Sequence, residues 1–255
     1  MFDWTAYLLA ALAALAAGAI NALAGGGTLI TFPTLIALGI PPVAANITST
    51  VSLCPGYFGA TLAQLGEIRS QSQRLWLVLP AALVGGVLGG ILLLNTDEKV
   101  FQSLVPFLIL GASLLLAVQT PVRAWLTHRL QAHTAKGIPT TWVIPLILLA
   151  AVYGGYFGAG LSVVVLAALA LILDDSLTRL NALKQAVAFG VNVATAVFFL
   201  FSGKVVWSLA FVMAIGALIG GVLGGKLAGN VNPNTLRWLV VTIGVCIAVL
   251  YWFKF

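Results

Sequence analysis

Charged side chains are scarce in this chain of 255 residues. Asp, Glu, Lys and Arg together make up 7% of it, whereas a soluble protein carries about 25%. Apolar residues account for 61%, and the mean hydropathy is +1.11. A soluble domain of this composition would aggregate, because it has too few polar groups to cover its surface. The composition therefore predicts an integral membrane protein.

Acidic residues are the rarest charged type, and each lies at or beyond the end of an apolar run. No carboxylate is therefore expected deep in the membrane, where it could carry a proton or Na⁺. Both histidines, His128 and His133, also lie outside the apolar runs. These absences argue against a cation pump. The acids are Asp3, Glu67, Asp97, Glu98, Asp174 and Asp175.

The sequence has two cysteines, Cys54 and Cys246, and both fall in apolar segments. Their spacing indicates neither a metal site nor a disulfide framework, so we interpret them as packing residues. The sequence contains no catalytic triad, phosphate-binding loop or cluster of metal ligands. We therefore expect no enzyme activity, no cofactor and no metal.

Continuous apolar runs make up most of the chain. Most of the long runs approach the roughly 17 to 25 residues that a membrane-spanning helix needs, and their lack of alternation argues against a barrel. Two further runs, Leu29 to Leu38 and Leu161 to Leu173, are short enough to predict re-entrant or interfacial segments. The eight long runs are Trp4 to Leu23, Ala44 to Gln64, Leu75 to Leu94, Val100 to Val118, Trp142 to Phe157, Leu183 to Phe201, Val205 to Gly225 and Leu236 to Phe253.

The sequence also repeats itself at a constant offset. Residues 82–90 return as 217–225 with the stretch Gly-Gly-Val-Leu-Gly-Gly intact, and at the same offset Gly25 and Asn46 recur as Gly160 and Asn181. We interpret this as a duplication, and the Gly-Gly-Val-Leu-Gly-Gly stretch itself as close helix packing by small residues. We predict an all-α polytopic membrane protein with two sequence-related halves. Each half would have four long transmembrane helices and one short re-entrant or broken segment.

The first half covers residues 1–119 and the second 142–255. Residues 120–141 between them form a polar stretch with Arg123, Arg129 and Lys136 but no acid. Such a positive excess is typical of cytoplasmic segments. We interpret the stretch as a basic cytoplasmic linker in preference to a nucleic-acid or lipid-binding patch, and we expect no nucleic-acid partner.

Two topologies remain open. If the short segments are re-entrant, each half crosses the membrane four times, the halves are parallel, and seven of the twelve Lys and Arg lie on the linker's side. If the short segments cross, each half crosses five times, the halves are inverted, and nine of the twelve lie there. Segment length favours the first topology and charge favours the second.

Each short segment follows a glycine-rich break, and the breaks are the candidate substrate site. Irregular backbone at membrane depth is tolerated only where protein or a wet cavity satisfies it. A short helix that starts after such a break would point its amide-rich, partially positive end at the break. The break is therefore a candidate anion-binding site. The residues involved are Asn21, Gly25, Gly26, Gly27 and Thr28 in the first half and Gly158, Gly160 and Ser162 in the second.

A polar cluster follows each short segment. Amides and hydroxyls can donate hydrogen bonds to an oxyanion without the desolvation cost of a fixed charge. Lys184 is either a ligand or a side chain that extends from a helix end to the membrane interface. The clusters contribute Asn46, Thr48 and Ser49, and Lys184, Gln185 and Asn192, to the candidate site.

These motifs resemble the TauE/SafE family of sulfite exporters. Relatives share three consecutive glycines before a short apolar segment with a proline, then an Ala-x-x-Thr-Ser cluster, the whole unit being duplicated. The second break departs from the pattern, since it lacks a run of glycines. The matching residues are Gly25-Gly26-Gly27, Pro33, Gly39-Ile40-Pro41-Pro42, Ala45 to Ser49, Gly158-Ala159-Gly160, Asn192 and Ser202 to Trp207.

The resemblance implies outward movement of small sulfur oxyanions or organosulfonates, such as sulfite or sulfoacetate, across the bacterial inner membrane. We expect a small anionic substrate and the lipid bilayer as partners, and the oligomeric state stays open. The alternative is a membrane-embedded assembly or scaffold protein whose glycines only pack helices. An intramembrane enzyme would lack a nucleophile and base.

Overall fold

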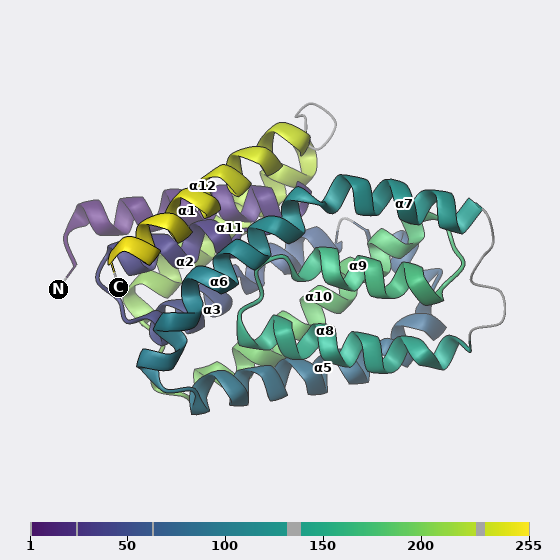
Figure 1. Cartoon of the computed structure of the whole chain (residues 1–255), viewed down its shortest axis with the longest axis horizontal. Coiled ribbons are helices and arrows are strands. Elements are labelled where there is room, and N and C mark those ends of the chain that lie inside the picture. The colour runs from purple at the N-terminus through teal and green to yellow at the C-terminus, as the bar shows by residue number, and fades with distance from the viewer. Residues whose placement is uncertain (1, 24, 63, 132–138, 228–232, 255) are drawn as a thin grey trace.

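The structure is a computed structural model that describes residues 2–23, 25–62, 64–131, 139–227 and 233–254. Every regular element in these ranges is helical, which confirms the all-α prediction (Figure 1). The helices of the first half are α1 (Trp4–Leu23), α2 (Thr28–Ala37), α3 (Pro42–Leu62), α4 (Leu65–Arg69), α5 (Ser72–Asn95) and α6 (Glu98–Ala117).

In the stretch that we predicted as a linker, helix α7 (Gln119–Gln131) follows α6 almost directly and packs on α9. Residues 132–138, with His133 and Lys136, lie outside the described residues. The remaining elements are a short 3₁₀ helix η1 (Thr140–Trp142), α8 (Val143–Tyr156), α9 (Leu161–Ile172), α10 (Leu177–Leu200), α11 (Trp207–Leu227) and α12 (Pro233–Lys254).

Five helices in the described part of the chain are long and apolar enough to cross a membrane, namely α1, α5, α6, α10 and α11. The protein is therefore a multi-pass membrane protein. The sequence predicts eight long spans, and three fall short of this criterion. Helix α3 has 21 residues but carries the polar cluster around Asn46, α8 has 14 residues, and α12 is counted only over Arg237–Trp252. The two short segments form α2, with 10 residues, and α9, with 12.

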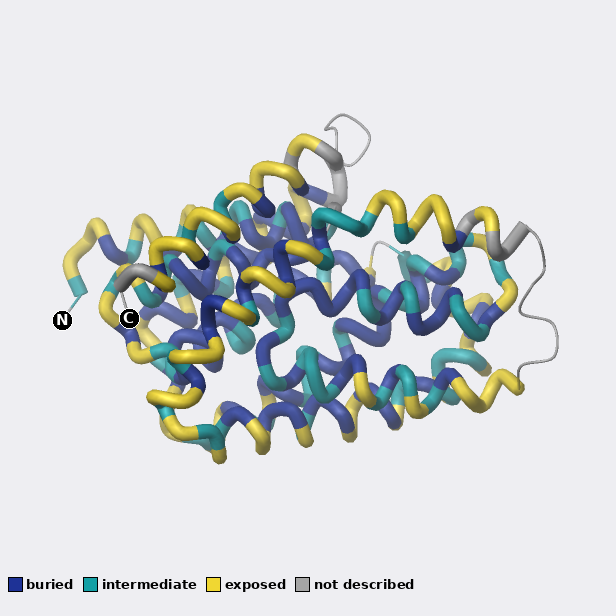
Figure 2. The backbone as a smooth tube through the Cα atoms, in the orientation of Figure 1, coloured by how far each residue is buried: buried dark blue, intermediate teal, exposed yellow. Residues whose placement is uncertain are grey.

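The distribution of polarity is that of a protein in lipid. Figure 2 shows buried backbone in the interior and exposed positions along the outer helices. Many of the exposed side chains are large and apolar, such as Leu149, Phe211 and Leu250, whereas Thr31, Ser49 and other hydroxyls are fully buried. Because lipid solvates apolar side chains, this protein places polar groups inside, where other protein groups satisfy them.

The two halves interlock through their glycine-rich helices. Helix α5 packs along α8, and α11 packs along α1. A Cβ atom on Gly85 would lie 2.5 Å from the Cβ of Ala151, and one on Gly216 would lie 2.5 Å from the Ala11 carbonyl oxygen. Only glycine allows these helices to approach so closely. The packing role that the sequence predicts for the first Gly-Gly-Val-Leu-Gly-Gly stretch is confirmed.

The helices of the second half begin in register with those of the first. Helices α3, α5 and α6 start at Pro42, Ser72 and Glu98, whereas α10, α11 and α12 start at Leu177, Trp207 and Pro233. The offset is the same for all three pairs, and it equals the offset that relates Gly25 to Gly160 in the sequence. This agreement supports the inference of a duplicated unit.

Corresponding helices of the two halves run in opposite directions. Helix α3 is antiparallel to α10, since Gln64 after the end of α3 accepts a hydrogen bond from Asn181 near the start of α10, and the Phe58 ring packs against the Phe189 ring. In Figure 1, α1 runs away from the labelled N-terminus, whereas α8 runs back toward that side. An odd number of passes in each half produces this reversal, so the helix directions favour the inverted arrangement.

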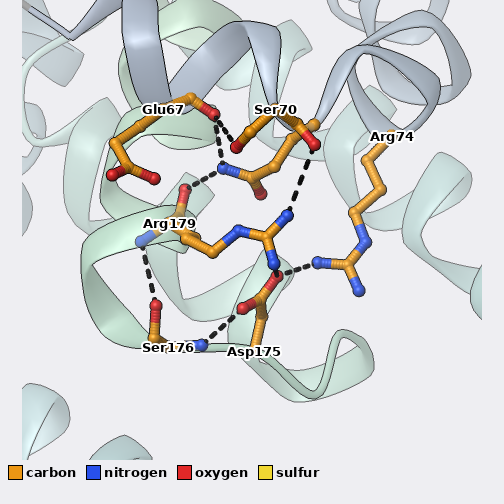
Figure 3. A network of polar contacts seen from close by, with 7 residues as sticks. Glu67, Ser70, Arg74, Asp175, Ser176 and Arg179 are labelled. Carbon is orange, nitrogen blue, oxygen red and sulfur yellow. Dashed lines mark hydrogen bonds and ion pairs between the residues drawn. The ribbon is translucent and has the colours of Figure 1, made fainter.

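An ion-pair network at one end of the bundle joins the halves (Figure 3). The Asp175 carboxylate, before α10, accepts from Arg74 of α5 and lies 3.3 Å from the Arg179 guanidinium. Arg179 also donates to the Ser70 carbonyl oxygen. The network places the start of α5 and the start of α10 at the same end. Asp175 is thus engaged at a helix end, as expected for an acid outside the membrane interior.

The inverted arrangement predicts on which side of the membrane Lys204 lies. Helix α10 extends about 36 Å, at roughly 1.5 Å per residue, from the end with Asp175 to the loop that holds Lys204. With the basic linker in the cytoplasm, Lys204→Cys should react with an impermeant thiol reagent only from the side opposite the cytoplasm. Arg123→Cys should react only from the cytoplasmic side. Both variants carry Cys54→Ala and Cys246→Ala, and labelling of both positions from one side would contradict the arrangement.

Candidate functional site

The first break is a glycine turn anchored by Asn21, a residue of α1 with 5% of its surface exposed. The Gly27 amide donates to the Asn21 Oδ1 atom over 2.7 Å. Gly25 and Gly26 have φ angles of +79° and +97°, which L side chains adopt only at a cost. The turn therefore needs glycine at these two positions, and it leads directly into α2.

The second break also combines glycines of positive φ with a side chain that bonds the loop, but the residues differ. Gly158 and Gly160 have φ angles of +80° and +76°, and Gly160 is the residue before α9. The Tyr153 hydroxyl donates to the Ala159 carbonyl oxygen over 2.5 Å. A tyrosine hydroxyl from α8 thus stabilises the second break, whereas an asparagine amide from α1 stabilises the first break.

The structure brings the two breaks into contact. A Cβ atom on Gly25 would lie 3.0 Å from the Ser162 Cβ and 3.1 Å from its Oγ. Gly25 lies before α2 and Ser162 in the first turn of α9, so the amide-rich starts of two short helices from opposite halves meet here. The sequence predicts each break, and the structure adds their contact.

The wall of this meeting point is apolar. Gly26 faces the Leu116 side chain and Gly160 faces Leu115, both of α6. Thr28 and Ser162 are 6% and 4% exposed and lie in the first turns of α2 and α9. The arrangement combines helix N-termini and hydroxyls with an apolar wall.

The first polar cluster ties α3 to its neighbours. The Ser49 and Thr31 hydroxyls are 2.6 Å apart, and the Asn46 Nδ2 atom donates to the Tyr156 carbonyl oxygen over 2.8 Å. The Thr48 hydroxyl oxygen accepts from the Val206 amide, so Thr48 fastens the start of α11. Thr31 was missed at the sequence level because it lies inside a segment whose pattern is apolar.

The second polar cluster lies at the far end of α3. The Lys184 ammonium donates to the Asn181 Oδ1 atom over 2.7 Å, and Asn181 donates to Gln64. Gln64 lies beyond the end of α3, whereas Asn46 is near its start, which separates the two clusters by roughly 25 Å at about 1.5 Å per residue. The structure therefore does not bring Lys184 to Asn46 and Ser49. Lys184 points toward the start of α10, and its role as a ligand stays a prediction.

Four of the predicted site side chains hold a buried polar atom that has no hydrogen-bond partner among the described residues. Buried amide groups are almost always paired, so each exception calls for a ligand or water that completes it. The assignment of O and N within each amide follows the surrounding hydrogen bonds. The four atoms are Asn21 Nδ2, Asn46 Oδ1, Gln185 Nε2 and Asn192 Oδ1.

The protein is a multi-pass helical bundle whose halves run in opposite directions. Its interrupted helices meet at an uncharged, hydrogen-bonding centre, and this arrangement is typical of transporters. Comparison with known proteins agrees. The model of the family described as "Sulfite exporter TauE/SafE" matches residues 10–251, and the chain belongs to this family. No solved structure matches the chain.

Similar proteins carry transporter names. A "Probable membrane transporter protein" of Haemophilus influenzae is 29% identical over 78% of this chain and 76% of its own length. "Probable membrane transporter protein ORF9" of Sinorhizobium sp is 28% identical over 98% of this chain and 94% of its own. "Probable membrane transporter protein YfcA" of Escherichia coli K12 is 24% identical over 92% and 85%. The protein is accordingly a membrane transporter.

Proposed function

We propose that the protein carries a small sulfur oxyanion or an organosulfonate, such as sulfite or sulfoacetate, outward across the bacterial inner membrane. The observation that supports this most directly is the contact between Gly25 of the first break and Ser162 of the second. Two helix N-termini that meet inside the bundle create a place of partial positive charge for an anion. The family description names sulfite exporters.

The chemistry of the centre suits a substrate that must be released. An S–O oxygen can accept hydrogen bonds from the free Asn21 Nδ2 atom and from the Thr28 and Ser162 hydroxyls. Neutral hydrogen bonds contribute about 0.5–1.5 kcal/mol each, whereas bonds to charged groups contribute about 1.5–3 kcal/mol. No Lys, Arg or His occurs in the sequence of either break. Because the site would bind the anion through neutral hydrogen bonds and helix dipoles alone, it can select its substrate and still release it.

The alternative of a scaffold protein accounts for only part of the structure. It explains why Gly85 and Gly216 pack against neighbouring helices. It does not explain the unpaired atoms of Asn21 and Gln185, which packing alone would leave at a cost. A transported anion or its water would complete them.

The function is tested by the flux of labelled sulfite into and out of proteoliposomes. We expect flux above that of empty liposomes, saturable with sulfite and inhibited by an alkanesulfonate. Absence of saturable flux in folded, reconstituted protein, over a range of small sulfur anions, would remove the proposal and favour the scaffold alternative.

We further predict that the membrane potential drives the flux. Moving one negative charge out of a negative interior gains about 2.3 kcal/mol per 100 mV. Methanesulfonate is the clean probe because it remains ionised, whereas bisulfite could bring a proton with it. Its flux should follow an imposed potential and persist when the pH gradient is collapsed. Strict dependence on the pH gradient would show that a titratable group couples transport, and Asp174 and Asp175 would be examined first.

A further inference from the structure

Helix α10 carries a row of amide side chains on the face that it turns toward α3. Asn181, Gln185 and Asn192 are spaced by four and seven positions, so they lie on one side of the helix. Asn181 donates to Gln64, which follows α3. Phe189, between Gln185 and Asn192, packs its ring against Phe58 of α3. These contacts orient the row toward α3.

Helix α3 carries the matching row. At the offset of the repeat, Asn46, Thr50 and Tyr57 correspond to Asn181, Gln185 and Asn192, and all six are polar. Helices α3 and α10 pack against each other in antiparallel orientation, and their starts are related by the same offset. An approximate two-fold relation that exchanges the helices also exchanges the rows, from which we infer that the α3 row faces α10. At its outer end, Asn46 donates to the Tyr156 carbonyl oxygen at the end of α8.

Together the rows extend through the bundle. Each covers three turns of helix, or about 17 Å, and the hydrocarbon core is about 30 Å thick. The α10 row starts at the end that holds Asp175 and Arg74, whereas the α3 row starts at the opposite end. Because the helices are antiparallel, one row leads inward from each surface.

Unpaired atoms distinguish these rows from ordinary polar contacts between membrane helices. Asn46 and Gln185 are 1% and 2% exposed, and each has an amide atom without a partner in the described structure. A row that served only to bind the two helices together would pair such atoms with partners on the facing helix. Lys184 lies beside Asn181 at the first entrance.

We propose that the facing polar rows of α3 and α10 form the route that the anion takes between the two aqueous sides and the meeting point of the breaks. This inference rests on the proposed transport function. Lys184 attracts the anion at the entrance on the linker's side, and the uncharged amides pass it inward. In this conformation the route is closed, since the unpaired atoms that line it are buried.

Cysteine accessibility tests the route without relying on transport. In a background with Cys54→Ala and Cys246→Ala, the positions Thr50, Gln185 and Asn192 are replaced by cysteine one at a time. Val197→Cys is the matched control, because Val197 lies on another side of α10 and is 50% exposed to the surroundings of the bundle. The probe is a methanethiosulfonate reagent with a sulfonate group, which does not enter lipid.

We expect cysteines in the rows to react roughly ten-fold faster than Val197→Cys, because the reactive thiolate forms only where water reaches it. Methanesulfonate should slow the reaction at the rows and leave Val197→Cys unchanged. Rates as slow as the control at all three row positions would overturn the route. Thr50→Cys changes the side-chain volume least, so it keeps the test decisive if an amide variant fails to fold.

The outcomes separate the route from the function. If the parent protein transports methanesulfonate but the cysteines in the rows do not react, the proposed route is wrong and the proposed function stands. Reactive rows that methanesulfonate protects, in a parent without flux, would support the route as a binding cleft and remove the transport function.

Discussion

We expect Gly25→Val to reduce methanesulfonate flux by about ten-fold or more, a change that corresponds to at least about 1.4 kcal/mol. The valine would have to adopt a φ of +79°, and even its Cβ would lie 3.0 Å from the Ser162 Cβ. To relieve this contact the start of α9 must move away from the first break, which separates the two helix N-termini. Flux per folded transporter in proteoliposomes measures the effect.

Gly39→Val is the matched control for this change. Gly39 has a φ of +84°, so the backbone strain is similar, but among the described residues no atom beyond its chain neighbours lies within 4 Å of where its Cβ would be. We expect Gly39→Val to lose stability through backbone strain alone, and to keep near-parental flux per folded transporter. Equal flux in the two variants would show that the contact between the breaks is not part of the transport site.

We expect Gly155→Val to prevent most of the protein from folding. A Cβ atom on Gly155 of α8 would collide with the Gly86 carbonyl oxygen of α5, which is backbone and cannot turn aside. Overpacking a well-packed core costs about 1–3 kcal/mol or more, and here two long helices would have to separate. Size-exclusion chromatography of detergent-solubilised protein should show mostly aggregate and a small monodisperse peak.

Gly111→Val controls for the loss of a helical glycine. Gly111 lies in α6 and is exposed, and in the part of the chain that the structure describes no atom outside its own helix turn lies within 4 Å of its Cβ position. We expect a monodisperse peak close to that of the parent. A stable Gly155→Val protein with parental melting behaviour would contradict the close packing of α5 and α8.

The candidate site could be predicted in its parts and not in its assembly. Three glycines before a short apolar segment indicate a break and a helix start, and the break indeed contains residues with positive φ. That Gly25 lies against Ser162 is a contact between residues from opposite halves of the chain. No local pattern encodes such a contact, since it depends on how the halves pack.

The polar clusters show the same limit. Ser49 and Lys184 follow the two short segments in equivalent places along the chain, and that symmetry suggested one shared site. In the antiparallel pair of α3 and α10 the equivalent places lie at opposite ends, so the clusters are far apart. Thr48 was predicted as a ligand, and the structure shows its hydroxyl oxygen at the start of α11.

The sequence by itself determined that this protein lies in a membrane and that its secondary structure is helical. Low charge requires lipid, and continuous apolar runs require helices whose backbone groups pair within each segment. The offset at which motifs recur in the sequence equals the offset between three pairs of helix starts. Only the tertiary structure decided the directions of the helices, the contact between the breaks and the separation of Lys184 from Asn46. These depend on the close approach of helix backbones at Gly85, Gly155 and Gly216, where the packing of distant segments outweighs any preference of the local chain.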